Sequence, residues 1–480
     1  MDGSKLHVAI LVSPGMGHLI PVLVLANRLA THHRVKVTVL VVTTVFSPPE
    51  CQLLKLPDEQ NPVDIIELPP VDISHLVKPD TKVGTQLCMM VREALRGFRS
   101  AISAMYHRPD ALIVDLFCTE ALPIAAEFNM AKYVYVPTTA WFTALTLYCP
   151  VLDKEIDGQY VDQEDLLKIP GCKPVRPEDV VDPMLDRNDQ HYYEYVSMGN
   201  RIPQYDGILL NTWEDLDSIT LKAFKENEIW RSMVKIPVYP IGPLRRPAQP
   251  DGSKSAVIEW LDKQPNESVI FVSFGSGGML SAQQITELAI GLELSEQRFI
   301  WVVRPPMKGA ADDAFFTTKT VYSDGTSHYL PEGFLTRTES LGLVVPTWAQ
   351  QVEILDHPSV GGFMSHCGWN STIESICSCV PMIAWPLYAE QRLNATYLVE
   401  ELGIAVRPRV LPTKEVVARE EIENMLRTLM DEKEGKKMRE NVKKLKISAE
   451  NALRKGGSSY NSMLEMLKHV TTNLKASEHC

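Results

Sequence analysis

The apolar residues of the chain fall into segments of two lengths that alternate. Short runs rich in Val, Ile and Leu lie at 7–12, 35–42 and 111–116, and polar residues, Ser13 and Thr43, directly follow the first two. A longer segment with apolar residues on one face, 20–31, lies between the first two runs. Short buried strands that alternate with amphipathic helices are typical of an α/β fold built on a parallel sheet.

The same alternation begins again after residue 255. Strands are predicted at 268–274, 299–303, 342–346, 361–365 and 381–384, and helices at 281–295, 370–377 and twice within 414–455. The Pro- and Gly-rich segment 237–253 separates the halves and carries the strongest linker signal in the chain. We therefore predict two Rossmann-like domains, 1–244 and 256–455, joined by a linker at 245–255 and followed by a last helix within 456–480.

Composition excludes several classes of protein. Of the 480 residues 45% are hydrophobic and 22% are charged, as in an ordinary soluble globular protein. The net charge of −12 argues against nucleic acid or an anionic membrane as a partner. No apolar run reaches the roughly 18 residues that a membrane span needs, and the run 6–12 is too short for a signal peptide. The nine cysteines form no CxxC, which favours reduced thiols and a cytoplasmic protein.

The segment 348–391 is dense in Trp, His, Asn, Gln and Glu, although apolar runs surround it. A buried polar group without a partner costs about 1–3 kcal/mol, so a core keeps such groups mainly where they find partners. A lone Trp is usually a core residue and a lone Asn-Ser is usually a helix cap. Their concentration in one segment favours a polar ligand instead.

The order of these residues indicates which ligand it is. The predicted strand before His366 runs into a predicted helix, and free backbone N–H groups at a helix start bind phosphate. Trp348 offers a flat face for a base, and such stacking is worth about 1–3 kcal/mol. Glu374 can accept ribose hydroxyls, and Glu390 and Gln391 follow the next strand, where they can bind sugar hydroxyls. The ligand class that fits is a nucleotide diphosphate sugar.

The segment 348–391 also resembles the signature segment of plant family 1 UDP-dependent glycosyltransferases, W-A-x-Q, H-x-x-x-G-G-F-x-[ST]-H-C-G-W-N-S-x-x-E and [DE]-Q. The resemblance extends to SPGMGHLIP (13–21), LIVDLF (112–117), PTTA (137–140), LLNTWEDL (209–216), PVYPIGPL (237–244) and VSFGSGG (272–278). The chain is most similar to the branch that acts on hydroquinone, monolignols and related phenolics. The resemblance implies a GT-B fold of two facing domains, with the acceptor bound by the first, the donor by the second, and the last helix returning to the first.

The resemblance also implies roles for individual residues. In the family pattern the uracil contacts fall to Trp348 and Ala349, the ribose contacts to Gln351 and Glu374, the phosphate contacts to Ser276, His366, Asn370 and Ser371, and the sugar contacts to Trp369, Glu390, Gln391 and Thr139. Gln391 resembles the members that use glucose. Two positions depart from the pattern. Gln350 replaces a proline, which we expect to loosen the turn that carries Trp348, and Cys379 replaces a glycine where the family packs closely.

His18 and Asp115 are the candidate catalytic residues of the first half. A phenol has a pKa near 10, so its attack is helped by a base that works near neutrality, and histidine suits this task. His18 follows the first predicted strand, and Asp115 ends a later one. From spacing alone, His18 is equally a turn residue bonded to the backbone. The family resemblance implies that His18 is the base and Asp115 the partner that orients its imidazole.

The sequence predicts a metal-free reaction without a bound cofactor. The chain contains one DxD, 215–217, and we expect it to start a helix. The leaving UDP would be stabilised by the helix start and His366. No close carboxylate pair suggests a double displacement. We therefore expect one inverting displacement, in which glucose passes from UDP-glucose to a phenol, monolignol or flavonoid and gives a β-O-glucoside.

The acceptor pocket is predicted to be built by loops near 80–95, 115–120, 140–150 and 185–200. The candidate wall residues are Phe117, Trp141, Phe142 and Tyr148, each of which could equally belong to the core. We expect the protein to be a monomer.

Two other functions were considered. An oxidoreductase or nucleotide-sugar epimerase would need GxGxxG after the first strand and an acidic residue about 20 residues on. PGMGHL (14–19) lacks that spacing, and the second predicted strand, 35–42, ends without Asp or Glu. A binder of nucleotide sugars or phenolics without activity is opposed by the retention of His18, Asp115, Glu390 and Gln391.

Overall fold

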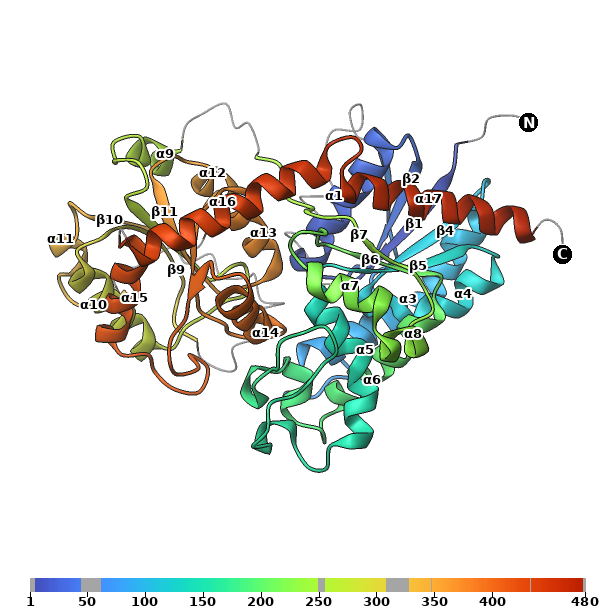
Figure 1. Ribbon diagram of the computed structural model, residues 1–480, viewed down its shortest axis with the longest axis horizontal. Coiled ribbons are helices and arrows are strands. Elements are labelled where there is room, and N and C mark those ends of the chain that lie inside the picture. The colour runs from blue at the N-terminus through green and yellow to red at the C-terminus, as the bar shows by residue number, and fades with distance from the viewer. Residues whose placement is uncertain are drawn as a thin grey trace. The chain divides into compact units, whose positions relative to one another are not determined.

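A computed structural model of the chain describes residues 5–44, 62–248, 255–307, 328–346, 348–431 and 433–477. The chain folds into two compact units (Figure 1). Unit 1 comprises Met1–Leu244 and Ala449–Cys480, and unit 2 comprises Arg245–Ser448. Residues 249–254 of the predicted linker lie outside the described residues.

Unit 1 is built on a seven-stranded sheet in which all neighbouring strands are parallel. Its strands, in spatial order, are β3 (Val63–Glu67), β2 (Lys36–Val41), β1 (His7–Val12), β4 (Ala111–Asp115), β5 (Ala131–Val136), β6 (Gly207–Leu210) and β7 (Val238–Pro240). The chain order reverses between β1 and β4. Such a reversal separates the two connections that leave the neighbouring strands, and it creates a crevice at their carboxyl ends.

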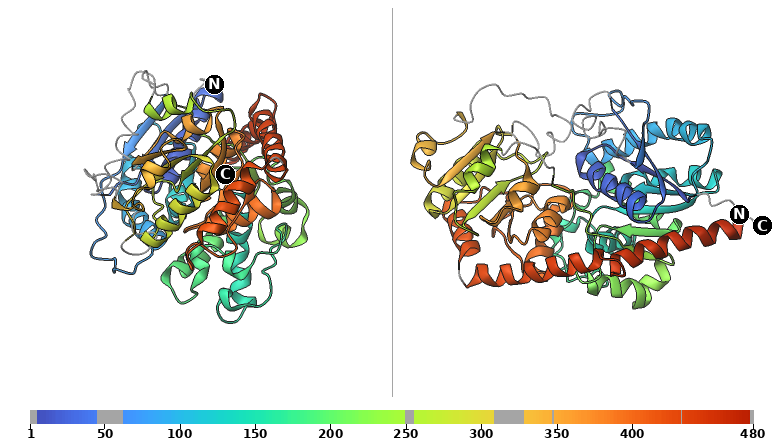
Figure 2. Two further views of the ribbon diagram at one scale, coloured as in Figure 1. Left: turned by 90° about the vertical axis from the view of Figure 1, so that its left-hand side faces the viewer. Right: turned by 90° about the horizontal axis from the view of Figure 1, so that it is seen from above.

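The helices of unit 1 come from the first half of the chain, except for α17, which comes from its last residues. They are α1 (Met16–His32), α3 (Val83–Ala104), η1 (Leu116–Ala121), α4 (Leu122–Glu127), α5 (Ala140–Glu155), η2 (Tyr160–Asp162), η3 (Pro177–Asp179), η4 (Asp182–Leu185), α6 (Gln190–Arg201), η5 (Ile202–Gln204), α7 (Ser218–Glu226), α8 (Glu228–Met233) and α17 (Ser458–Ser477). α17 packs on β5 and β7 (Figure 2), where His469 Nδ1 lies 2.9 Å from the hydroxyl of Tyr133. Apolar residues of α1 and α17 share one core with the strands. The family resemblance predicts that the last helix returns to the first domain. In the structure the last helix, α17, belongs to unit 1.

Unit 2 repeats the arrangement with a six-stranded parallel sheet. Its strands, in spatial order, are β10 (Gly342–Pro346), β9 (Arg298–Val303), β8 (Val269–Ser273), β11 (Val360–Ser365), β12 (Met382–Ala384) and β13 (Ala405–Val406). Its helices are α9 (Ala256–Leu261), α10 (Ala282–Ser295), α11 (Phe334–Arg337), α12 (Gln351–Leu355), α13 (Trp369–Cys377), α14 (Gln391–Thr396), η7 (Tyr397–Glu401), α15 (Arg419–Met430) and α16 (Glu434–Leu453), the last of which runs on into unit 1. Here the order reverses between β8 and β11.

The segments predicted as acceptor-pocket loops are largely helical, so the prediction that they are loops was wrong, whereas their place in the acceptor pocket stays a prediction. The range 80–95 falls mostly in α3, 115–120 in η1, 140–150 in α5, and 185–200 largely in α6. α3 carries an apolar stripe at helical spacing, including Leu87, Val91 and Phe98, which is buried in unit 1. The helical spacing of this stripe by itself predicts a helix, which the prediction of a loop did not take into account.

The two departures from the family pattern, Cys379 and Gln350, both lie in unit 2. Cys379 follows α13 and its C-cap Ser378, with φ of +65° and a half-buried side chain. This is the left-handed position that commonly ends a helix and favours glycine. The glycine of the family pattern suits this left-handed backbone, and Cys379 adopts the same backbone at a cost of about 1 kcal/mol. Gln350 has φ of −73°, an angle that a proline could share, so the looser turn at Trp348 stays a prediction.

Candidate functional site

The two predicted catalytic residues meet where the strand order of unit 1 reverses. Leu11 of β1 pairs with Val114 of β4, so the residues that follow each of them lie side by side. Gly15 has φ of +111°, which lets the chain turn so sharply that α1 already begins at Met16. His18 therefore lies in the first turn of a helix, not in a free turn. Its Nδ1 atom lies 2.9 Å from Oδ1 of Asp115, a carboxylate with no exposed surface.

The second oxygen of Asp115 is also bonded. The hydroxyl of Ser13, which is fully buried directly after β1, donates to Oδ2 of Asp115. A buried carboxylate needs such donors because an unpaired charge in the core is costly. With Asp115 accepting from Nδ1–H, the imidazole of His18 carries its lone pair on Nε2. The pair has the chemistry of a general base held in one tautomer.

Among the predicted acceptor residues, Phe117 lies nearest to this pair. Its ring meets that of His18 edge-on at 5.1 Å between centroids, and it is partly exposed. Trp141, Phe142 and Tyr148 belong to α5 and are at most 9% exposed. Tyr148 packs against Trp230 with centroids 5.8 Å apart. The structure thus places Phe117 at the catalytic pair and the other three largely in the core.

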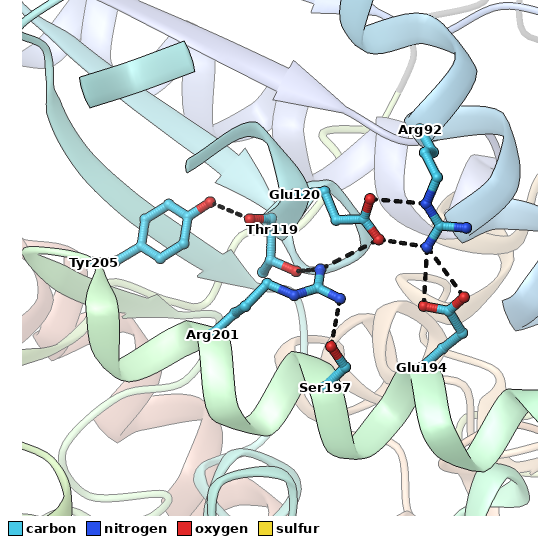
Figure 3. A network of polar contacts seen from close by, with 7 residues as sticks. All are labelled: Arg92, Thr119, Glu120, Glu194, Ser197, Arg201 and Tyr205. Carbon is cyan, nitrogen blue, oxygen red and sulfur yellow. Dashed lines mark hydrogen bonds and ion pairs between the residues drawn. The ribbon is translucent and has the colours of Figure 1, made fainter. Parts of the chain in front are cut away.

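A network of charged and polar side chains fixes η1, the turn that carries Phe117 directly after Asp115 (Figure 3). Arg92 of α3 donates to both oxygens of Glu120 in η1, at 2.9 and 2.5 Å, and to Glu194 of α6 at 3.1 Å. Arg201 donates to the Thr119 hydroxyl at 3.2 Å. Three segments far apart in sequence are thereby held together beside the catalytic pair. Because Arg92 is 41% exposed, the network contributes more to geometry than to stability.

The predicted donor residues gather where the strand order of unit 2 reverses. Gly275 follows β8, and His366 follows β11, the neighbouring strand. Gly275 has φ of +72°, and a Cβ atom built on it would lie 2.5 Å from the ring of His366. Glycine is therefore required for the turn to pass this close to the histidine. The exposed Ser276 comes next in the turn.

His366 is neutral at physiological pH. Burial, together with the positive charge of Arg304, lowers its pKa to about 4. A neutral imidazole can donate one N–H to a phosphate oxygen without adding charge. It lies just before α13, whose first residues include Asn370 and Ser371. Backbone N–H groups at a helix start carry partial positive charge, so this edge favours an anion.

The predicted ribose ligands form one bonded group. Gln351 Nε2 donates to the hydroxyl of Ser371 at 2.9 Å and to Oε2 of Glu374 at 2.6 Å. Burial raises the pKa of Glu374 above its ordinary value. Trp348 follows β10 after one intervening residue, and 61% of its surface is exposed. Every other tryptophan of the described residues is buried or half-buried. Ala349, next to Trp348, is half-buried. An exposed indole at a strand end can serve as a stacking surface.

Backbone hydrogen bonds fix the orientation of the side-chain amide of Gln391, one of the predicted sugar ligands. Oε1 of Gln391 accepts from the backbone N–H groups of Leu387 and Tyr388, at 2.9 and 3.0 Å. The side-chain amide can therefore offer a ligand only its N–H donors. Glu390 directly precedes α14, and Trp369 begins α13 with 3% of its surface exposed.

Asn394 connects the phosphate and sugar ends of this cluster. It is fully buried, and its Nδ2 donates to the carbonyl of Cys367 at 2.9 Å and to Oε1 of Glu390 at 3.2 Å. Since both partners are acceptors, the orientation of the amide is fixed. Cys367 and Ala389 have left-handed backbones, with φ of +65° and +57°. Such strain in non-glycine residues is typical of functional sites.

Thr139 stands apart from the other predicted donor residues. It belongs to unit 1, is fully buried, and caps α5 by accepting from the backbone N–H of Phe142 at 3.0 Å. The sequence analysis also missed Ser13 and Asn394. Ser13 could have been found as a polar residue directly after a buried strand, on the same rule that selected Asp115. Asn394 carried no signal, because its contacts join segments that only the fold brings together.

The described ranges contain neither a metal-ligand cluster nor a membrane-spanning helix. No group of three or more His, Cys, Asp or Glu side chains there is placed to hold a metal ion. No helix in the described part of the chain combines the length and the apolar character that crossing a membrane requires.

Comparison with known proteins gives consistent matches along the whole chain. Residues 240–449 match the family described as UDP-glucoronosyl and UDP-glucosyl transferase. The chain is 55% identical to anthocyanidin 3-O-glucosyltransferase 5 of Manihot esculenta over 96% of its own length and 94% of that protein. It is 42% identical to hydroquinone glucosyltransferase of Rauvolfia serpentina, over 96% and 97%. The crystal structure of TcCGT1 in complex with UDP superimposes with a TM-score of 0.91 at 48% identity, covering 98% of this chain and 100% of that one.

The chain therefore belongs to the plant UDP-glycosyltransferases. Its two parallel-sheet units are those of the GT-B fold. The family and fold class predicted from sequence are confirmed, and the oxidoreductase or epimerase alternative is excluded.

The buried state of His366 predicts a dependence of stability on pH. Its pKa is about 4 in the folded protein and near 6.5 when exposed, so the unfolded chain takes up a proton first as pH falls. The stabilisation is complete above pH 6.5 and is lost as pH falls toward 4, by about 3 kcal/mol in total. We expect urea unfolding at pH 7 and pH 4.5 to show a smaller difference in His366→Gln than in the wild type. Equal pH dependence in the two proteins would contradict the buried neutral state.

Proposed function

We propose that this enzyme transfers glucose from UDP-glucose to a hydroxyl group of a small phenolic plant metabolite, such as a simple phenol, a monolignol or a flavonoid. The product is a β-O-glucoside, and the reaction inverts the anomeric centre and needs neither a metal nor a bound cofactor. The observation that carries the proposal is the bonded pair of His18 and Asp115. The names of two relatives, an anthocyanidin glucosyltransferase and a hydroquinone glucosyltransferase, support the class of acceptor.

The catalytic pair supplies the base that a phenolic acceptor needs. Nε2 of His18 accepts the hydroxyl proton while the oxygen attacks the anomeric carbon of glucose. Asp115 holds the imidazole through Nδ1 and stabilises the imidazolium that forms, and Ser13 holds Asp115. A positioned general base is typically worth about 10²–10⁴ in rate. Phe117, with its ring against that of His18, would contact the aromatic acceptor.

The donor cluster supplies the leaving-group chemistry. As the bond from glucose C1 to the UDP oxygen breaks, the electron pair stays on the phosphate, where His366 and the start of α13 offer hydrogen-bond donors. Attack from the opposite side converts the α-linked donor into a β-linked product in one displacement. Gln391, which offers only N–H donors, would bind a glucose hydroxyl as the acceptor of that bond.

The acceptor class can be tested directly. The purified protein, incubated with UDP-glucose and hydroquinone, coniferyl alcohol or a flavonol, is expected to form monoglucosides that mass spectrometry detects, and proton NMR should show the β anomer. An α-linked product would contradict the inverting mechanism. Glucosides of aliphatic alcohols only would contradict the phenolic acceptor.

Removal of the base should separate binding from transfer. In His18→Ala we expect kcat to fall by at least about 10²-fold, because the phenol proton has no acceptor. The dissociation constant for UDP, measured by calorimetry, should not change, because the residues predicted to bind uracil, ribose and phosphate belong to unit 2. Asp115→Asn, which keeps the shape of the side chain without its charge, should also lower kcat. Wild-type turnover in His18→Ala would rule out the base assignment.

The polarity of Gln391 predicts a selective loss in Gln391→Glu. The carboxylate can still accept from the N–H groups of Leu387 and Tyr388, but it has no N–H for the sugar. We expect kcat/KM for UDP-glucose to fall about 10-fold or more, equivalent to about 1.4 kcal/mol, whereas UDP binds as before. If UDP and UDP-glucose weaken equally, Gln391 does not contact the sugar.

A further inference from the structure

Arg304 is the first residue after β9, the strand next to β8. Its guanidinium donates to the backbone carbonyl of Ser276, in the turn that follows β8. A pocket lies beside this turn and is lined by Gly275, Gly278, Trp301 and Arg304 among others. Arg304 is thus built into the edge of the sheet where the strand order of unit 2 reverses.

The turn held by Arg304 lies against the predicted phosphate ligands. Gly275 approaches the ring of His366 so closely that a Cβ atom there would lie 2.5 Å from it, and a Cβ atom on Gly277 would lie 2.6 Å from the Tyr388 hydroxyl. The charge of Arg304 also acts on His366, since it helps to lower the pKa of that histidine. Arg304, Ser276 and His366 therefore belong to one neighbourhood.

The phosphate ligands implied by the family pattern bring no full positive charge. Ser276, Asn370 and Ser371 are uncharged, and His366 is neutral at pH 7. A diphosphate, in contrast, is multiply charged, and the start of α13 offers about half of one elementary charge. Arginine remains protonated at any physiological pH, even where burial lowers its pKa as it does here.

We propose that Arg304 is the cationic residue of the donor-phosphate site, where it fixes the turn of Ser276 through its carbonyl and sets a permanent positive charge beside the diphosphate. This inference rests on the use of a UDP-sugar as donor. Arg304 is a positioning residue, because it acts through the turn and through its charge. Its charge stabilises UDP most when the C1–O bond breaks and the electron pair collects on the phosphate.

The test separates the charge of Arg304 from its hydrogen bond. Arg304→Gln keeps an N–H donor without charge, Arg304→Met keeps the apolar stem, and Arg304→Lys keeps the charge. Dissociation constants for UDP and for uridine are measured by calorimetry, with displacement titration for weak binding. We expect UDP to bind about 10-fold or more weakly to both neutral variants and within about 3-fold of wild type to Arg304→Lys. Uridine, which carries no phosphate, should bind all four proteins alike.

Two results would overturn the inference. Unchanged UDP affinity in Arg304→Gln or Arg304→Met would show that the charge is not felt by the diphosphate. An equal loss for uridine and UDP would show that the variants merely disturb the turn. Should the Gln variant fail to fold, the Met variant supplies the same comparison. A wild-type protein that does not bind UDP would instead contradict the proposed donor, which the same titration reveals separately.

Discussion

The geometry of both sites depends on one constraint, the reversal of strand order within a parallel sheet. In unit 1 it separates the connections after β1 and β4, and Ser13, His18 and Asp115 lie at those two strand ends. In unit 2 the same reversal falls between β8 and β11, where the turn of Gly275 meets His366. Each sheet thus brings backbone and side-chain groups of separate segments together at its carboxyl edge.

The histidines at the two sheet edges lie in different electrostatic surroundings. In unit 1 the buried carboxylate of Asp115 lies 2.9 Å from Nδ1 of His18 and orients the imidazole. In unit 2 burial and the charge of Arg304 keep His366 neutral, so that it is suited to donate to phosphate. The surroundings of the two histidines therefore differ, because His18 is bonded to a carboxylate whereas His366 is influenced by a guanidinium.

The surroundings of His18 and Asp115 are helical rather than loop-like. Helices α3, α5 and α6 take up much of the regions predicted as loops, and the Arg92 network ties α3 and α6 to η1, beside Asp115 (Figure 3). A base must be held within hydrogen-bonding reach of its substrate, so fixed neighbours serve the chemistry. Asn394 has the corresponding effect in unit 2, where it fixes Glu390 relative to the turn at Cys367.

The sequence by itself determined the α/β class, the two halves and the family. Strand and helix periodicities are local properties, and the segment 348–391 keeps its distinctive residues within one stretch of chain. The geometry in which His18 and Ser13 bond to Asp115 needs the folded sheet, because these residues are 97 and 102 positions from Asp115 in the chain. The tertiary structure likewise decided that Asn394 bridges Cys367 and Glu390, and that Cys379 occupies a left-handed helix end. These features depend on register, burial and backbone angles, which no spacing of residue types encodes.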